Sequence, residues 1–242
     1  MLEKIKQNTF VHFRYLPEAA GFNVKTDQNL TIINCGLGSS MFNIVCGNCY
    51  TEKVQNIVNE FEGQPFAWWM IESKILSRKL LEHGFITETE ERAMLCDLTN
   101  FESSANQLIK IDQVLNRDRL EHFIKVLETY DTTARSFYEK LTEPLLNQQE
   151  KLFVGYENDI PVVIAILFIS GDTASIFSLV TEENKRGLGY VGTEMMIHLM
   201  DTARKIGTRY ATLSASSDSG YRIYERLGFL TFGQFECFEW RS

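Results

Sequence analysis

One stretch, residues 173–201, constrains the fold of this chain more than any other. It begins with an apolar, β-branched run that predicts a buried strand. A polar turn and the glycines Gly187, Gly189 and Gly192 follow, and apolar residues then recur at three- and four-residue steps, which predicts a helix. A glycine-rich turn that opens a helix binds anions, because the first N–H groups of the helix lack internal partners. The sequence therefore predicts a phosphate-binding loop.

The glycine spacing fits some phosphate loops and excludes another. A P-loop is excluded, because no Lys followed by Ser or Thr comes after the second glycine. The three glycines match the GxGxxG fingerprint of dinucleotide-binding folds, and Asp218 lies near the position of its ribose-binding acid. About 50 residues remain after the fingerprint, too few for the further strands and helices of a doubly wound sheet. A dinucleotide-dependent oxidoreductase therefore stays open as the weaker alternative.

Residues 181–191 resemble motif A of the GNAT acetyltransferase superfamily. In that motif, Arg-x-x-Gly-x-Gly/Ala follows a strand and opens the helix that binds the pyrophosphate of acetyl-CoA. Arg186 and Gly189 match the arginine and the central glycine. Val191 stands where Gly or Ala is usual, and Gly192 comes one residue later.

The residues after this loop continue the same family pattern. Residues 209–216 predict a strand, and residues 221–229 predict a short helix whose tyrosine and Gly-Phe end resemble GNAT motif B. Residues 235–240 predict a last strand. The resemblance covers about the last 100 residues, and the order of its elements is more specific than any single motif.

The resemblance implies an N-acetyltransferase that uses acetyl-CoA as co-substrate, needs no metal, and takes a small-molecule or peptide amine as acceptor. Tyr224 would protonate the departing thiolate, and Glu183 is the candidate for the group that takes a proton from the amine. A second register of motif A places Asn184 at the arginine position. Glu183 stands where motif A commonly has a proline, and Val191 stands where it has Gly or Ala. These two departures from motif A keep a non-catalytic CoA-binding or interaction protein open as an alternative. The implied cofactor contacts are Leu179, Val180, Thr181, Arg186, Gly187, Leu188, Gly189, Tyr190, Val191 and Gly192.

The order of predicted strands and helices in the first hundred residues is similar to that in the last hundred. His83-Gly84-Phe85 occupies the place that Leu227-Gly228-Phe229 holds later. We therefore predict a degenerate GNAT-like first half that lacks a cofactor loop. The predicted elements of this half are a helix at 5–13 with a break at Pro17, strands at 30–35, 41–46, 65–71 and 92–99, and helices at 51–61 and from Ser73 to His83.

The polar residues 100–106 are the best linker candidate. We predict a degenerate domain at 1–102 and a catalytic domain at 107–242. The predicted fold class is α/β (α+β), with two GNAT-like domains, each a mixed, mostly antiparallel twisted sheet flanked by helices. The further elements expected in the second domain are strands at 108–114, 151–156 and 161–170 and helices at 117–128 and 132–146.

Charge and hydropathy exclude several classes of partner. The net charge of −8 argues against a nucleic-acid surface, which is usually basic. No apolar run reaches about 18 residues, so no membrane span is expected. The N-terminal residues lack the apolar core of a signal peptide, and the expected location is the cytoplasm. Cys46 and Cys49 form a lone CxxC, and reduced structural cysteines are favoured over a zinc site that would need Cys35 and a fourth ligand.

Overall fold

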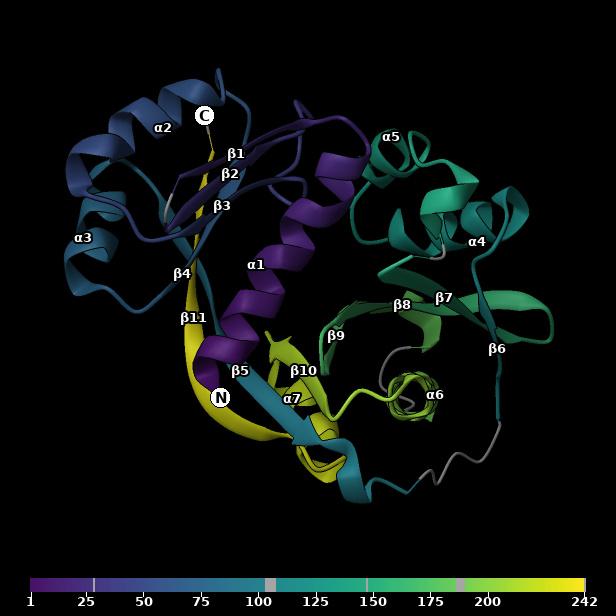
Figure 1. The fold of residues 1–242 in the computed structure, drawn as a ribbon. Coiled ribbons are helices and arrows are strands. Elements are labelled where there is room, and N and C mark those ends of the chain that lie inside the picture. The colour runs from purple at the N-terminus through teal and green to yellow at the C-terminus, as the bar shows by residue number, and fades with distance from the viewer. Residues whose placement is uncertain (28, 103–107, 147, 186–189, 242) are drawn as a thin grey trace. The chain divides into compact units, whose positions relative to one another are not determined.

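The computed structural model (Figure 1) describes residues 1–27, 29–102, 108–146, 148–185 and 190–241. Arg186, Gly187, Leu188 and Gly189 of the predicted phosphate loop lie outside the described residues. The chain forms two compact units. Unit 1 comprises Met1–Ala93, Ser214–Asp218 and Thr231–Ser242, and unit 2 comprises Met94–Leu213 and Ser219–Leu230.

In unit 1 the strands follow one another in the order β1-β2-β3-β4-β11, with helices packed on them. The pairs β1–β2, β2–β3 and β4–β11 are antiparallel, and β3–β4 is parallel. Helix α1 packs on β1, β2 and β3 (Figure 1). The elements of this unit are α1 (Leu2–Ala19), β1 (Asn23–Asp27), β2 (Leu30–Asn34), β3 (Asn43–Gly47), η1 (Thr51–Lys53), α2 (Val54–Glu60), β4 (Phe66–Ile71), α3 (Lys74–Glu82), the first part of β5 (Ile86–Asp97) and nearly all of β11 (Leu230–Trp240).

The two neighbouring tryptophans of β4 show how unit 1 divides its side chains between the two faces of the sheet. Successive strand residues point to opposite faces. Trp68 is fully buried, and its indole N–H donates to the Gly47 carbonyl at 2.9 Å. Trp69 is half-buried on the other face, where its ring lies 5.0 Å from that of Phe13 on α1 and 5.7 Å from that of Phe235 on β11. Both tryptophans therefore serve the packing of unit 1.

In unit 2 the strands follow one another in the order β10-β9-β8-β7-β6. The pairs β6–β7, β7–β8 and β8–β9 are antiparallel, and β9 and β10 are parallel. The helix α6 connects the parallel pair, as such a crossover requires. The elements are η2 (Leu98–Asn100), β6 (Lys110–Gln113), α4 (Arg117–Leu127), α5 (Ala134–Tyr138), η3 (Glu143–Leu146), β7 (Glu150–Glu157), β8 (Ile160–Ser170), β9 (Thr173–Thr181), η4 (Glu183–Lys185), α6 (Tyr190–Ile206), β10 (Tyr210–Ala215) and α7 (Asp218–Arg226).

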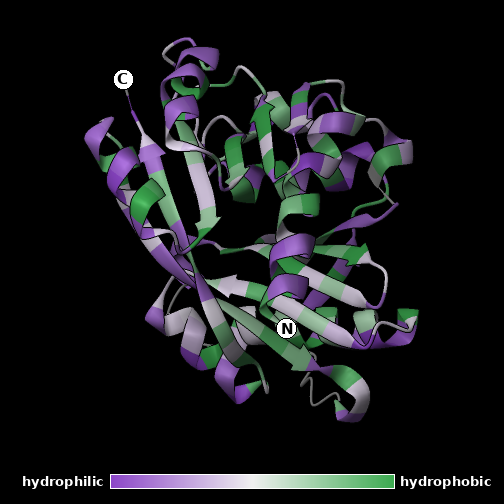
Figure 2. Cartoon of the chain, turned by 60° about the vertical axis from the view of Figure 1, so that its left-hand side comes forward, coloured by the Kyte–Doolittle hydropathy of each residue, from purple (hydrophilic) through white to green (hydrophobic). Residues whose placement is uncertain are grey.

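The core of unit 2 lies on both faces of β8. Every residue from 162 to 168 is buried, and a strand with such a run needs cover on both faces. Helix α4 packs on β7 and β8, and α6 packs on β8 and β9. The hydropathy colours of Figure 2 agree with this packing, because the strands carry apolar segments while the helices alternate between apolar and polar residues.

Two helix ends in the two halves of the chain have the same hydrogen-bond pattern. After α3, Gly84 has φ of 86° and donates to Leu81, and the Phe85 N–H donates to Leu80. After α7, Gly228 has φ of 91° and donates to Glu225, and the Phe229 N–H donates to Tyr224. Both are Schellman motifs, and the phenylalanine that follows each glycine is buried. The predicted correspondence of the two Gly-Phe positions is therefore reproduced in the backbone.

Most predicted elements are present, with two corrections. The predicted break at Pro17 is wrong, because α1 continues to Ala19. Pro17 falls in the last turn, so the helix loses the hydrogen bond that an N–H at this position would make but ends only two residues later, and the Pro17 carbonyl accepts the Phe22 N–H. The helix predicted over 132–146 is much shorter, because α5 ends at Tyr138. Pro144 disfavours helical geometry in the residue before it, and the 3-10 turn η3 replaces the last part.

The compact units differ from the predicted domains in where the last strand lies. β11 pairs with β4 from Phe235 opposite Ile71 to Trp240 opposite Phe66, so the last strand of the chain completes the sheet of unit 1. The last residues of β5, from Met94 on, belong to unit 2. The domain boundaries 1–102 and 107–242 remain a prediction. Among the described residues, no helix has the length and apolarity that a membrane crossing requires.

Candidate functional site

The strand β9 carries a bulge at the point where the sequence places the cofactor residues. Ile166 pairs with Phe177 and Ile164 pairs with Val180, so Ser178 and Leu179 together lie opposite the single residue Ala165. Ser178 has φ of 49°, a left-handed conformation that non-glycine residues seldom adopt. A bulge bends its strand and increases the local twist. The end of β9 is therefore bent relative to the part before the bulge, while Val180 and Thr181 stay paired with β8.

The parallel ladder between β9 and β10 stops before this bulge. It runs from Thr173 opposite Tyr210 to Ser175 opposite Thr212, whereas β9 itself continues to Thr181. The buried hydroxyls of Ser175 and Thr212 lie 2.6 Å apart at this last pair. The two strands are thus fastened at one end and diverge beyond it. Diverging strands leave room for main-chain pairing with an extended ligand.

The start of α6 lies against the end of β9. A Cβ added to Gly192 would meet Leu179 Cδ2 and Thr181 Oγ1, each at 3.9 Å. Val191 is buried, and the first turn of α6 carries no acidic side chain. The predicted cofactor residues Leu179, Thr181 and Gly192 are therefore brought together. The positive end of the helix dipole at this place suits an anion.

The two predicted catalytic side chains come from different elements. Tyr224 is half-buried on α7, with its ring centroid 6.2 Å from that of Phe229. Glu183 is exposed at the start of η4, directly after β9. The contact of Tyr224 with Phe229 is one that a purely structural tyrosine would also make. The catalytic roles of both residues stay predictions.

A polar cluster between α4 and β7 was missed by the sequence analysis. Tyr156 is buried, and its hydroxyl lies 3.0 Å from His122 Nδ1. The Arg119 guanidinium lies 4.9 Å from the centroid of the Tyr156 ring and forms an ion pair of 2.8 Å with Asp112. Burial raises the pKa of Tyr156 above its ordinary value, so this hydroxyl stays protonated at neutral pH. The one signal in the sequence is the three-residue spacing of Arg119 and His122, which places them on one face of α4.

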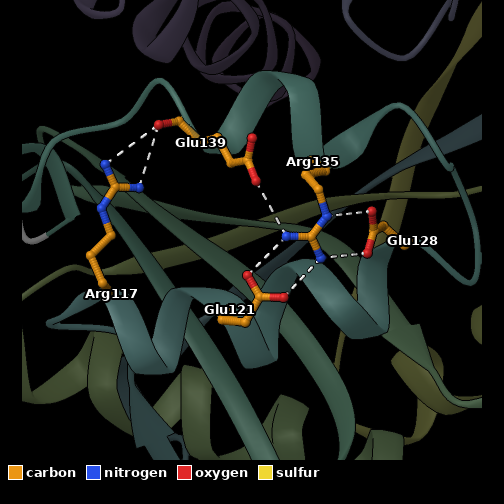
Figure 3. Close-up of polar contacts among 5 residues, drawn as sticks. All are labelled: Arg117, Glu121, Glu128, Arg135 and Glu139. Carbon is orange, nitrogen blue, oxygen red and sulfur yellow. Dashed lines mark hydrogen bonds and ion pairs between the residues drawn. The ribbon is translucent and has the colours of Figure 1, made fainter.

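A second network joins α4 to α5 (Figure 3). The Arg135 guanidinium of α5 contacts Glu121 at 2.8 Å, Glu128 at 2.8 Å and Glu139 at 3.3 Å. The hydrogen bonds that Arg135 donates to Glu121 and then to Glu128 raise the pKa of Arg135. Arg117 on α4 adds a longer contact to the Glu139 carbonyl at 3.4 Å. Arg135 therefore fixes α5 on α4 by holding three carboxylates at once.

The cysteines show no arrangement for metal or redox chemistry. All five cysteines are in the reduced form, and Cys46 is buried. Burial raises the pKa of Cys49 to about 11, whereas a reactive thiol has a lowered pKa. In the part of the chain that the structure describes, no three His, Cys, Asp or Glu side chains form a group that could hold a metal ion.

The sequence of residues 113–229 matches the model of the Acetyltransferase (GNAT) family. Residues 113–229 therefore form a GNAT domain. The domain runs from the end of β6 to the residue after Gly228, so it contains the bulged β9 and α6. A dinucleotide-binding fold needs a doubly wound parallel sheet, whereas β6, β7, β8 and β9 of this GNAT domain are joined by antiparallel pairs. The sequence matches no curated protein.

The fold of the whole chain is similar to solved structures. A functionally unknown conserved protein from Staphylococcus epidermidis has a TM-score of 0.70 and 15% identity, over 92% of this chain and 95% of that chain. A GCN5-related N-acetyltransferase from Kribbella flavida has a TM-score of 0.68 and 14% identity, over 96% and 94%. A tandem GNAT protein from the clavulanic acid biosynthesis pathway has a TM-score of 0.56 and 7% identity, over 87% and 78%. The likeness is one of fold, and it extends beyond the GNAT domain to the first half, as the predicted fold class requires.

Proposed function

We propose that the chain is an N-acetyltransferase that moves an acetyl group from acetyl-CoA to the amine of a small molecule or peptide. The observation that carries this proposal is the divergence of β9 from β10 after the Ser175–Thr212 pair, with the bulge at Ser178 beyond it. The GNAT domain supports acyl transfer in general. The acetyl donor and the amine acceptor are the specific parts of the proposal.

The donor would lie along the end of β9. The main-chain groups of Leu179 and Val180 would pair with the amides of the pantetheine arm, as in an added strand. Thr181, Tyr190, Val191 and Gly192 lie at or beside the start of α6, where the pyrophosphate would meet helix N–H groups. Arg186, Gly187, Leu188 and Gly189 would complete this loop.

The reaction would proceed by direct attack in a ternary complex. The neutral amine attacks the thioester carbonyl carbon, a C–N bond forms, and the C–S bond breaks. The amine nitrogen gives up a proton, for which Glu183 is the candidate acceptor, and the CoA thiolate takes a proton from Tyr224. Each of the two side chains must lie within hydrogen-bond distance of the bound reactants. Such hydrogen bonds often reach their final length only once the reactants are bound.

The decisive experiment is a parallel calorimetric titration of the purified chain with acetyl-CoA, NAD and NADP. We expect heat from acetyl-CoA alone, with one site per chain, because motif A occurs once. An assay of thiol release on a panel of amines then tests for transfer. Binding without turnover on a broad panel would favour the non-catalytic CoA-binding protein. Heat from a nicotinamide dinucleotide alone would overturn the proposal.

A further inference from the structure

The carboxylate of Glu157 joins two residues that are adjacent to the predicted phosphate loop. The Lys185 ammonium donates to Glu157 Oε2, and the Tyr190 hydroxyl donates to Glu157 Oε1. Lys185 ends η4 and Tyr190 begins α6, so these are the described residues directly before and after 186–189. The Glu157 carboxylate thus links the end of η4 to the start of α6.

The position of Glu157 is fixed by a tight hairpin. Glu157 is the last residue of β7 and pairs with Ile160, the first residue of β8. The two residues between them, Asn158 and Asp159, have φ of 50° and 62°. Two successive positive φ angles are typical of a type I′ turn, whose twist matches that of the flanking strands. The carboxylate is therefore presented by a rigid part of the sheet.

The electrostatics show that this carboxylate is charged. The hydrogen bond from Lys185, followed by that from Tyr190, lowers the pKa of Glu157. The same contact raises the pKa of Tyr190, so the tyrosine keeps the proton that it donates. About a quarter of each side chain of the Glu157–Lys185 pair is exposed, 25% and 27%. A fixed negative charge would repel a pyrophosphate, so contact with the cofactor is not the role of Glu157.

We infer that Glu157 is a positioning residue of the anion site: it sets the spacing between the end of η4 and the start of α6. This inference rests on the proposed function. Ordering a binding site opposes association, and the N–H groups at the start of α6 lose less freedom on binding an anion when Glu157 already holds Tyr190. Glu157 should therefore affect the affinity for the pyrophosphate part of CoA and leave the affinity for the pantetheine part unchanged.

The test compares two ligands on three variants. The full chain is titrated with CoA by calorimetry and with pantetheine, which lacks the pyrophosphate, by ligand-observed NMR. We expect Glu157→Gln to raise the Kd for CoA about tenfold, since a hydrogen-bonded charge is lost. Tyr190→Phe, which removes one of the two bonds, should raise it about threefold. The Kd for pantetheine should stay within about twofold of the wild-type value.

Asp201→Asn is the matched control. Asp201 also holds two cations on α6, Lys205 at 2.6 Å and Arg204 at 3.2 Å, but it does so in the C-terminal part of the helix. Its substitution should leave both affinities unchanged. Melting curves confirm that each variant is folded, and Tyr190→Phe carries the test if Glu157→Gln does not fold.

Two results would overturn the inference alone. One is an unchanged Kd for CoA in both Glu157→Gln and Tyr190→Phe, with wild-type binding intact. The other is an equal weakening of CoA and pantetheine, which would mean a general structural role for Glu157. Failure of the wild-type chain to bind CoA would instead overturn the proposed function, and this inference with it.

Discussion

Ser175 and Thr212 face each other at the last parallel pair between β9 and β10, and their hydroxyl oxygens lie 2.6 Å apart in the buried core. Each hydroxyl is the other's hydrogen-bond partner at the point where the strands begin to diverge. The Ser175–Thr212 pair therefore holds β9 and β10 together at the end of the ladder next to the proposed cofactor site. The energetic value of this contact can be measured directly.

Thr212→Val should lower the free energy of unfolding by about 1–2 kcal/mol, because it leaves the buried Ser175 hydroxyl without this partner. Thr212→Ser should cost less, since it keeps the hydroxyl. The double variant Ser175→Ala/Thr212→Val should be more stable than the sum of the single losses predicts, because no polar group is then stranded. Urea unfolding of the wild type, Ser175→Ala, Thr212→Val and the double variant measures this cycle. Additive losses would show that the two hydroxyls do not depend on each other.

The two Schellman motifs give a matched pair of predictions in the two halves. Gly84→Ala and Gly228→Ala should each lower the free energy of unfolding by about 1–2 kcal/mol, because an alanine at positive φ brings its Cβ close to a backbone oxygen. Gly38→Ala is the control, since a Cβ there meets nothing within 4 Å and the residue has no left-handed φ. Chemical denaturation measures all three. A stable Gly228→Ala variant would contradict the cap geometry.

The contact at the start of α6 predicts a size limit at Gly192. Its Cβ position lies 3.9 Å from Leu179 and Thr181, an ordinary van der Waals distance. Gly192→Ala should therefore keep the affinity for CoA within about twofold. Gly192→Val should weaken it about tenfold, because the added methyl groups press on β9 and displace the helix start. Calorimetry with CoA distinguishes the two, and equal affinities would contradict this packing.

Local sequence patterns predicted the strand β9 and the helix α6 of the site, because each element has its own periodicity. The bulge was not predicted, since Ser178 gives no sign of positive φ in the sequence; the register with β8 imposes it. The Glu157–Tyr190 contact joins residues far apart along the chain, and a hydrogen bond of this kind leaves no local pattern. The pairing of β11 with β4 depends likewise on register between distant segments.

The Arg135 network predicts a salt-dependent stability of the α4–α5 pair. Arg135→Gln should lower the Tm in low salt, because Glu121, Glu128 and Glu139 would then repel one another without a cation between them. The loss should fall by at least about half in 1 M NaCl, where the Debye length is about 3 Å. Arg78→Gln is the control, since among the described residues Arg78 forms an ion pair with one carboxylate, that of Glu82 in the same helix. A loss that does not depend on salt would indicate packing by the arginine stem.

Tyr224 provides the sharpest test of the chemistry. If its hydroxyl protonates the departing thiolate, Tyr224→Phe should lower kcat about 10²-fold and leave the Kd for acetyl-CoA nearly unchanged. The packing against Phe229 survives this substitution, because the ring is kept.

Tyr221→Phe is the matched control on the same helix, where the Tyr221 hydroxyl donates to Glu225 at 2.6 Å. It should leave kcat unchanged. If both variants lower kcat equally, the effect belongs to α7 as a whole. If neither does, another group protonates the thiolate and Tyr224 has only the packing role that its contact with Phe229 already supplies.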